Sequence, residues 1–455
     1  MNLNILKRSV ATVLLFALIL CCIPMTSCKT KGAVIVTDKN TVEMAIADGI
    51  DPSDESLVAK GYKSYVQLVM IESQRLIAAL YDLEGKDAEK KLLQGGYTVK
   101  TAFDPAIWSA MVQMEKDLGS DSMNVGCAIT DYDGNLCAVY SSGEQNYAAT
   151  PQSPHSSFKP LSVYAPAMEK GIIDWSKTYV DMPYLSLDDG MGNYTDWPKN
   201  ASGEYTGQKT TMYVGIQQSL NTMAVHCLGD LGVLESMRFL TENFGIDLSY
   251  EQSRYAVKGE NEIIGNIALG SIYSGVTPID MAGFYQIFGN LGMYEIPHTV
   301  LEIVDSEGNT VYEYKSEKKR IISEETAYVM NRLLMGVVDY GGTGVRATVK
   351  GIEVAGKTGT GELNESNWFV GLTPEYSCAV WHSNSGIGNI APAMFSSVMN
   401  YMPEGTNTTA EFEKCPNIYK GVYCAESGLM FSDDCSRMQI GYYVRGEEPK
   451  PCNAH

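Results

Sequence analysis

The sequence predicts an α+β fold, with an antiparallel sheet flanked by helices and an additional all-α subdomain. Apolar runs between residues 125 and 140 enclose an Asp-Gly pair, which is a strong signal for a β-hairpin. Residues 352–370 contain two further apolar strands joined by a Gly-rich turn. Helical patterns over 212–229 and 235–244 predict the all-α subdomain. A chain of 455 residues is long enough for two domains.

The first 28 residues have the pattern of an export signal. Lys7 and Arg8 precede an uncharged run over residues 10–24, which is shorter than the roughly 20 residues that a membrane-spanning helix needs. Small residues just before Cys28 resemble a bacterial lipoprotein cleavage box, although Met25 stands where leucine is usual. We expect cleavage before Cys28 and lipidation there. An uncleaved anchor is the alternative, and both arrangements place the rest of the chain outside the cytoplasmic membrane.

Residues 29–95 have a helical pattern that is amphipathic over 64–83. They are expected to form a short pedestal, or the remnant of a larger segment, in front of a main domain over 96–400. Residues 401–455 form a tail that contains cysteines and is expected to pack on the main domain or to extend it.

Within the main domain, a helical pattern follows Ser156, and Pro166 is expected to kink that helix because proline has no N–H to donate. Residues 176–210 are rich in Gly, Asp, Asn and Tyr and predict an irregular loop region beside the substrate. A second hairpin is predicted over 300–314 and a helix over 324–338.

The Gly-rich stretch over 341–344 lacks the spacing of a phosphate-binding loop and is expected to be an ordinary turn. The net charge of -20 argues against nucleic acid as a partner and against adsorption to anionic lipid through a basic surface.

Four of the 11 cysteines lie in the tail, without the Cys-x-x-Cys spacing that would suggest zinc. In an exported protein this even set could form two disulfides, with three possible connectivities. The four are Cys415, Cys424, Cys435 and Cys452.

Four further cysteines lie in apolar surroundings and are expected to be buried thiols. The five histidines show no metal-ligand spacing. We therefore predict no metal and no cofactor. The expected buried thiols are Cys127, Cys137, Cys227 and Cys378.

Three short polar motifs follow one another along the chain. Ser-x-x-Lys begins at Ser156, Ser-x-Asn begins at Ser219, and Lys-Thr-Gly-Thr begins at Lys357. The first two patterns carry little weight alone, because they recur at Ser316 and Ser122. Lys-Thr-Gly-Thr occurs once, in the predicted strand pair. The three in this order are the set found in serine β-lactamases and penicillin-binding proteins.

The flanks of the motifs strengthen this similarity. Residues 154–160, 218–225 and 355–374 resemble the three motif segments of penicillin-binding protein transpeptidase domains, and residues 95–105 resemble the entry to that domain in class A enzymes. The resemblance covers roughly residues 95–455. It implies a β-lactamase/transpeptidase-like fold of the serine penicillin-recognising family, here without the glycosyltransferase domain of class A enzymes.

The serine and lysine of the first motif suit acyl transfer. A serine hydroxyl is a weak nucleophile at neutral pH and needs a base to take its proton. The i, i+3 spacing puts Ser156 and Lys159 on one helical face, so Lys159 can be that base. It must then be neutral, which burial and the nearby charge of Lys357 would favour.

By resemblance, Ser219 returns the proton to the leaving amine, and Asn221 holds Lys159 and the substrate amide. The backbone N–H groups of Ser156 and Thr360 would form the oxyanion hole. The residues implied to bind the substrate's terminal carboxylate beside Lys357 are Thr358, Gly359 and Thr360.

The implied reaction is peptidoglycan cross-linking by a D,D-transpeptidase. Ser156 would attack the D-Ala-D-Ala bond of a stem peptide, and a β-lactam would acylate the same serine. Alternatives are a D,D-carboxypeptidase and a β-lactam-sensing or wall-binding protein with weak turnover. A β-lactamase is less favoured, because no deacylating glutamate can be assigned. Stem peptides, β-lactams, the membrane and cell-wall synthesis proteins are the expected partners.

One position departs from the family pattern. Family members usually have glycine immediately before the nucleophile, whereas this chain has His155. Glycine allows tight backbone geometry at the helix entrance, so His155 could alter acylation or β-lactam affinity.

Overall fold

The computed structural model describes residues 34–40, 43–47, 62–188, 191–383, 386 and 388–453. The predicted signal sequence and the lipidation candidate Cys28 lie outside these residues. None of the helices in the described ranges is both long and apolar enough to cross a lipid bilayer.

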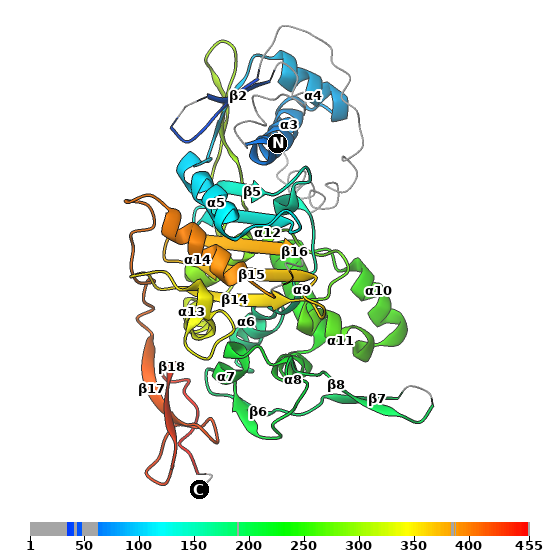
Figure 1. Ribbon diagram of the computed structural model, residues 1–455, viewed down its shortest axis with the longest axis vertical. Coiled ribbons are helices and arrows are strands. Elements are labelled where there is room, and N and C mark those ends of the chain that lie inside the picture. The colour runs from blue at the N-terminus through cyan, green and yellow to red at the C-terminus, as the bar shows by residue number, and fades with distance from the viewer. Residues whose placement is uncertain are drawn as a thin grey trace.

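A five-stranded antiparallel sheet forms the centre of the molecule (Figure 1), with the order β14-β15-β16-β4-β5. This confirms the predicted antiparallel sheet and the hairpin around the Asp-Gly pair. Pairing of β16 with β4 joins strands that are far apart in the sequence. The strands are β4 (Val125–Asp131), β5 (Leu136–Ser141), β14 (Ala355–Thr360), β15 (Ser366–Leu372) and β16 (Tyr376–Ser383).

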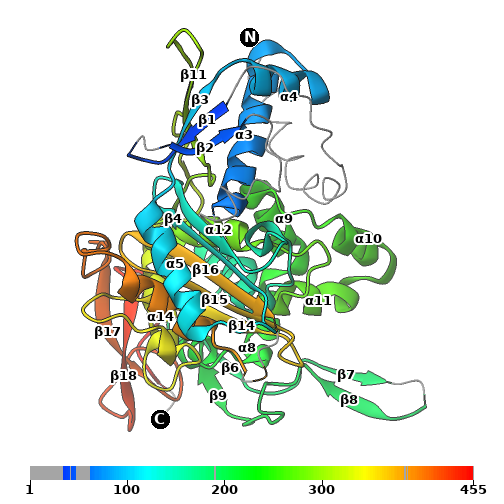
Figure 2. The same ribbon diagram turned by 45° about the horizontal axis from the view of Figure 1, so that its top comes forward.

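Helices cover both faces of this sheet, as Figure 2 shows. Helices α5 (Pro105–Leu118) and α14 (Ala391–Tyr401) pack together over one face, and α12 (Pro278–Gly289) covers the other. Because both faces are covered, β15 is buried along its whole length.

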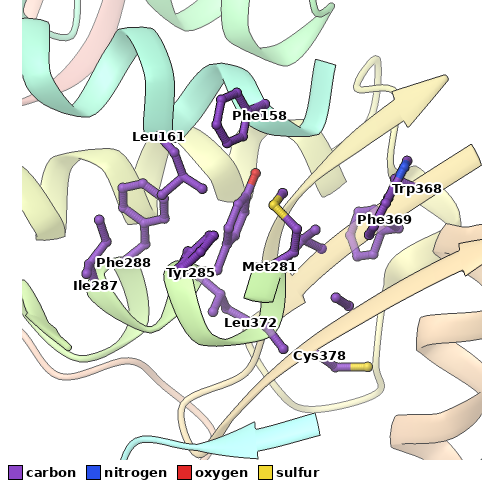
Figure 3. Close-up of a cluster of buried hydrophobic side chains, with 14 of the residues drawn as sticks. Phe158, Leu161, Met281, Tyr285, Ile287, Phe288, Trp368, Phe369, Leu372 and Cys378 are labelled. Carbon is purple, nitrogen blue, oxygen red and sulfur yellow. The ribbon is translucent and has the colours of Figure 1, made fainter. Parts of the chain in front are cut away.

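Helix α12 contacts both the sheet and the segment that carries Ser156. Figure 3 shows Tyr285 of α12 among Phe158, Met281 and Phe369, which come from that segment, α12 and the sheet. The Tyr285 hydroxyl donates a hydrogen bond to the Ser157 carbonyl oxygen. The same helix therefore packs on the sheet and is hydrogen-bonded to the Ser156 segment.

The predicted all-α subdomain is present beside the sheet. One detail of the prediction is wrong, because the helix expected over 212–229 is two helices, α7 (Met212–Gln217) and α8 (Asn221–Leu231). The chain breaks at Ser219, whose φ of 59° is left-handed and cannot continue a right-handed helix. The other helices of the subdomain are α9 (Val233–Phe244), α10 (Ser249–Lys258) and α11 (Glu260–Leu269).

The N-terminal part is not only helical. Besides α3 (Lys63–Tyr81) and α4 (Gly85–Gln94), it contains two strands that the helical pattern did not predict. Strand β1 pairs in parallel with β3, a long-range contact that local periodicity cannot reveal. The resulting mixed sheet has the order β12-β11-β3-β1-β2 and crosses the predicted boundary at residue 95. Its strands are β1 (Val34–Thr37), β2 (Glu43–Ala47), β3 (Thr98–Thr101), β11 (Val300–Val304) and β12 (Thr310–Glu313).

The region 176–210 is more regular than predicted, because it contains two short ribbons, β6 with β9 and β7 with β8. The β7–β8 ribbon extends away from the body of the molecule in both Figure 1 and Figure 2. The four strands are β6 (Thr178–Val180), β7 (Leu185–Asp188), β8 (Tyr194–Trp197) and β9 (Lys209–Thr211).

After the second hairpin, β10 (Met293–Tyr294) pairs with β13 (Lys319–Arg320), and α13 (Glu324–Val338) has the bounds that the sequence predicts. In the tail, β17 (Ile418–Cys424) and β18 (Met438–Val444) form a hairpin below the sheet.

Candidate active site

Ser156 lies in a helical segment that changes type along its length. It begins as a 3-10 helix over His155–Phe158, widens to a π-helix over Pro160–Tyr164, and ends as α6 over Ala165–Glu169. The Ala165 N–H donates to the Pro160 carbonyl, five residues earlier, just before Pro166, which has no N–H to donate. The disturbance predicted at Pro166 therefore takes the form of a wide π-turn.

Hydrogen bonds from several elements hold this segment. The His155 N–H donates to the Gly270 carbonyl at 3.0 Å, and the Ser157 hydroxyl donates to the Pro154 carbonyl at 2.6 Å. Trp368 Nε1 of β15 donates to the Ser153 carbonyl at 2.8 Å. The backbone on both sides of Ser156 is thus fixed against α11 and the sheet.

Strand β14 approaches the Ser156 segment closely at Gly359. A Cβ atom at this position would lie 2.4 Å from the Pro154 carbonyl oxygen and 3.1 Å from Ser157 Oγ. Any side chain here would separate the strand from the Ser156 segment. The glycine of Lys-Thr-Gly-Thr therefore has a steric role, distinct from the hydrogen-bonding roles of its neighbours.

The two lysines of the motifs meet at Ser219. Lys159 Nζ donates to the Ser219 carbonyl oxygen at 2.9 Å and to Asn221 Oδ1 at 2.7 Å. Lys357 Nζ donates to Ser219 Oγ at 2.7 Å and to the Thr358 carbonyl oxygen at 3.1 Å. Side chains from all three sequence motifs are thus connected by hydrogen bonds.

Both lysine side chains are completely buried. Burial lowers the pKa of Lys159 well below its ordinary value, and the charge of Lys357 lowers that pKa further. Burial also lowers the pKa of Lys357, to about 7. Among the residues that the structure describes, no carboxylate acts on either amine to raise these values.

The hydrogen bonds of Lys159 leave it ready to accept a proton. A neutral lysine amine has two N–H bonds and one lone pair, and Lys159 donates to two acceptors. The lone pair is then the remaining site on Nζ. Ser156 and Lys159 are three residues apart at a 3-10 helix, a spacing that places their side chains on one side of the helix.

Ser219 does not cap the helix that follows it. Leu220 occupies the N-cap position of α8 and makes no side-chain cap. Instead, Asn200 Oδ1 accepts from the N–H groups of Asn221 and Thr222 at 2.9 and 3.3 Å. Because a distant asparagine supplies the cap, the Ser219 hydroxyl oxygen can accept the hydrogen bond from Lys357.

A buried carboxylate supports this cap. Asp181 Oδ1 accepts from Asn200 Nδ2 at 2.8 Å and from the Thr222 hydroxyl at 2.7 Å, and the Thr206 N–H donates to Asp181 Oδ2 at 2.9 Å. Burial alone would raise the pKa of Asp181, but these hydrogen bonds hold it below its ordinary value. Sequence reasoning missed both Asp181 and Asn200, which lie in the region predicted to be irregular.

The two threonines of the third motif share one face of β14, opposite Lys357 and Gly359. Thr358 Oγ1 lies 2.7 Å from Thr343 Oγ1. Asn389 Nδ2 donates to Thr360 Oγ1 at 3.0 Å and to the Gly359 carbonyl oxygen at 2.9 Å.

Thr343 and Asn389 were not predicted. Thr343 belongs to the Gly-rich turn at 341–344. The position of that turn shortly before the third motif could have indicated that Thr343 lies near the site. Asn389 lies shortly after β16, where nothing in the sequence singles it out.

His155 adopts a backbone conformation that favours glycine. Its φ is 49°, in the left-handed region, which explains in physical terms why glycine is usual at this position in the family. Burial lowers the pKa of His155, against the opposing effect of Glu365, whose Oε1 lies 4.0 Å from Nε2. The imidazole is therefore neutral at neutral pH and adds no charge beside Ser156.

The arrangement combines a hydroxyl, a neutral amine, a second hydroxyl held by a cation, and two threonines at a strand edge. These are the parts needed for acyl transfer through a serine ester. In the described ranges, the only group of side chains spaced to hold a metal is a set of tail cysteines, Cys424, Cys435 and Cys452.

Comparisons with known proteins agree with this chemistry. Residues 109–400 match the family described as the penicillin binding protein transpeptidase domain. The chain is 33% identical over 338 residues to penicillin-binding protein 1F of Bacillus subtilis, covering 70% of this chain and 43% of that protein. It is 28% identical over 377 residues to penicillin-binding protein 4 of the same organism, covering 77% of this chain and 57% of that protein. The chain therefore spans only about half the length of these relatives.

Solved structures with the same fold are also found. The penicillin-binding protein PonA1 from Mycobacterium tuberculosis matches with a TM-score of 0.62 at 21% identity, covering 76% of this chain and 94% of that chain. Penicillin-binding protein 1A from Haemophilus influenzae matches with a TM-score of 0.65 at 17% identity, covering 84% and 76%. The predicted β-lactamase/transpeptidase-like fold is thus confirmed. A further structure of PonA1 is a complex with penicillin V.

Proposed function

The chain belongs to the family of penicillin-binding protein transpeptidase domains, and on this premise we propose that it is a D,D-transpeptidase that cross-links peptidoglycan stem peptides. The observation that carries the proposal is the state of Lys159. It is buried, its pKa is lowered by burial and by Lys357, and two acceptors bind its N–H groups. A lysine in this state is a base for the Ser156 hydroxyl.

The first half-reaction forms an acyl-enzyme. Ser156 Oγ attacks the carbonyl carbon of the D-Ala-D-Ala peptide bond while Lys159 takes the hydroxyl proton. The C–N bond then breaks, and the proton passes through Ser219 to the leaving D-Ala amine. Lys357 already donates a hydrogen bond to Ser219 Oγ. The Ser219 hydroxyl proton therefore points away from Lys357 and can be donated to the leaving amine.

In the second half-reaction, the amine of a neighbouring stem peptide attacks the ester carbonyl and loses a proton to Lys159. The ester C–O bond then breaks, and Lys159 returns the proton to Ser156 Oγ. Thr358 and Thr360 bind the terminal carboxylate of the donor with Lys357. Backbone N–H groups of Ser156 and Thr360 stabilise the oxyanion. A β-lactam reacts in the same first step and remains on Ser156 as an ester.

A β-lactamase is less favoured, because the sequence gives no glutamate that can be assigned to deacylation. Rapid hydrolysis of the ester needs a base for water, such as a carboxylate. A D,D-carboxypeptidase, in which water replaces the acceptor amine, is the second candidate. His155 supports the third, a sensor with weak turnover, because a histidine instead of glycine occupies the left-handed position before the nucleophile.

We further propose that the chain acts outside the cytoplasmic membrane, held there by lipid on Cys28. The small residues before Cys28 and the apolar run over 10–24 support this. Polymeric peptidoglycan and cell-wall synthesis proteins would then be its partners. Metabolic labelling with a palmitate analogue tests the anchor, with Cys28→Ala expected to lose the label.

Covalent labelling by a fluorescent penicillin tests the active site. The full-length chain is expected to be labelled, with the label lost in Ser156→Ala and strongly reduced in Lys159→Ala. Ser316→Ala is the matched control, because Ser316 begins the same four-residue pattern but hydrogen-bonds to Glu295. Absence of label on the folded wild type would overturn the proposal, as would label that persists in Ser156→Ala.

A further inference from the structure

Three cysteines of the tail come together although they are far apart in the sequence. The Sγ atoms of Cys424, Cys435 and Cys452 all lie within 4.8 Å of one another. Cys424 ends β17, Cys435 lies in the turn region before β18, and Cys452 lies beyond β18. The fourth tail cysteine, Cys415, is not part of this group. The two disulfides considered from the sequence are not formed, because all four residues are thiols.

Polar groups lie close to two of these sulfur atoms. The Ser432 N–H donates to Cys435 Sγ at 3.4 Å, and the Ser432 hydroxyl lies 3.4 Å from the same sulfur. The Ser427 hydroxyl lies 3.2 Å from Cys452 Sγ. The Ser432 N–H is a donor to Cys435 Sγ, and hydroxyls at these distances can donate to a metal-bound thiolate and orient it. Cys424 and Cys452 are buried and Cys435 is half-buried, so the group is largely shielded from water.

The tail hairpin has little β-sheet pairing, although Tyr423 and Tyr443 are buried in the hydrophobic core. A two-stranded hairpin is marginally stable in water without a further element. Here the only strand partner of β17 is β18. Isolated bridges connect Met430 to Tyr423 and to Pro451, one residue before Cys424 and Cys452. The three thiols therefore lie where the hairpin, its connecting loop and the segment after β18 meet.

We propose that Cys424, Cys435 and Cys452 bind a zinc ion that ties these three segments of the tail together. Zinc takes thiolate ligands at about 2.3 Å in tetrahedral geometry, which places the sulfur atoms about 3.8 Å apart. Sulfur atoms within 4.8 Å of one another reach that separation with a movement of about 1 Å. Binding releases a proton from each thiol that becomes a ligand. The fourth ligand is a water molecule or another side chain.

Zinc fits this group better than a disulfide does. A disulfide needs an S–S distance of about 2.0 Å, and it would join two of the three sulfur atoms and leave the third as a thiol. Soft thiolate ligands also select zinc over magnesium or calcium. The absence of Cys-x-x-Cys spacing, from which no metal was predicted, does not exclude a site that three separate segments build.

The full-length chain, purified with reductant and Zn²⁺ and then freed of unbound metal, tests the site. Elemental analysis is expected to find one zinc per chain. Replacement by Co²⁺ is expected to give the intense visible absorption and the sulfur charge-transfer band of tetrahedral cobalt thiolate. Chelation is expected to speed proteolysis between residues 425 and 437.

Single serine variants identify the ligands. Cys424→Ser, Cys435→Ser and Cys452→Ser are each expected to lose the bound zinc, whereas Cys415→Ser, a tail cysteine outside the group, keeps it. Penicillin labelling of each variant reports whether the main domain is folded, and the cobalt spectrum of the wild type does not depend on any variant.

A wild-type chain without bound zinc would overturn the inference. So would equal zinc content in Cys435→Ser and Cys415→Ser. An intact mass lower by two hydrogens without reductant, with a disulfide mapped between two of the three cysteines, would assign the group to a disulfide instead.

Discussion

Substitution of Gly359 tests whether close contact between β14 and the Ser156 segment sets the acylation rate. In Gly359→Ala, the added Cβ would lie 2.4 Å from the Pro154 carbonyl oxygen. Such contacts are essentially never below 3.0 Å, so strand and segment must separate by at least about 0.6 Å. Displacements of about 1 Å at a reacting centre can cost on the order of 100-fold in rate. We therefore expect acylation to fall roughly tenfold or more, which corresponds to about 1.4 kcal/mol.

The assay is the second-order rate constant for acylation by a fluorescent penicillin, measured beside thermal unfolding. Gly356→Ala is the matched control, because it lies in the same strand. Its Cβ would meet Phe369 at 2.5 Å and the Val370 carbonyl oxygen at 2.7 Å, on β15 and not on the Ser156 segment. Both variants should lose stability, by about 1–3 kcal/mol for overpacking.

Only Gly359→Ala should lose acylation beyond its loss of folded protein. An acylation rate constant of Gly359→Ala equal to that of the wild type would refute the steric argument. Equal losses in both glycine variants would show that general destabilisation of β14, and not the approach to Ser156, controls the rate.

The pH profile of acylation should be bell-shaped: the rate falls at low pH as Lys159 gains a proton, and falls again above about pH 7 as Lys357 loses its charge. In Lys357→Arg the alkaline fall should disappear, because a guanidinium stays charged; an unchanged alkaline limb would contradict this assignment. Asn200→Ala should destabilise the protein by about 0.5–2 kcal/mol through loss of the α8 cap and should also slow acylation. Asn331→Ala, another buried asparagine, should affect thermal unfolding alone. His155→Gly should raise the melting temperature, by the equivalent of about 1 kcal/mol, because glycine relieves the left-handed φ; a lower melting temperature would show that the imidazole contacts outweigh the strain.

Local sequence patterns predicted the parts of this molecule that depend on local interactions. The hairpin around the Asp-Gly pair, α13 at 324–338 and the order of the three polar motifs all depend on residues that are neighbours in the chain. The motifs also predicted one site for Ser156, Lys159 and Lys357, and hydrogen bonds bring both lysines to Ser219.

The parts that sequence missed depend on contacts between distant residues. The β-branched run of β1 was a local strand signal that the helical interpretation of residues 29–95 overlooked, whereas its parallel pairing with β3 could not be predicted locally. Asn200 caps α8 from 21 positions before Asn221, in a loop whose composition predicts only irregularity. The cluster of cysteines around Cys435 was not predicted for the same reason, because spacing rules detect only metal sites whose ligands lie in short segments.

Exchange of the terminal D-Ala tests the central claim most directly. The full-length chain is incubated with a stem peptide that ends in D-Ala-D-Ala and with an isotopically labelled D-amino acid as acceptor amine, and the products are read by mass spectrometry. We expect the terminal D-Ala to be replaced by the labelled residue, and Ser156→Ala to abolish the replacement. Recovery of the peptide shortened by one D-Ala, without any labelled product, would contradict the transpeptidase claim and assign the chain to the carboxypeptidases.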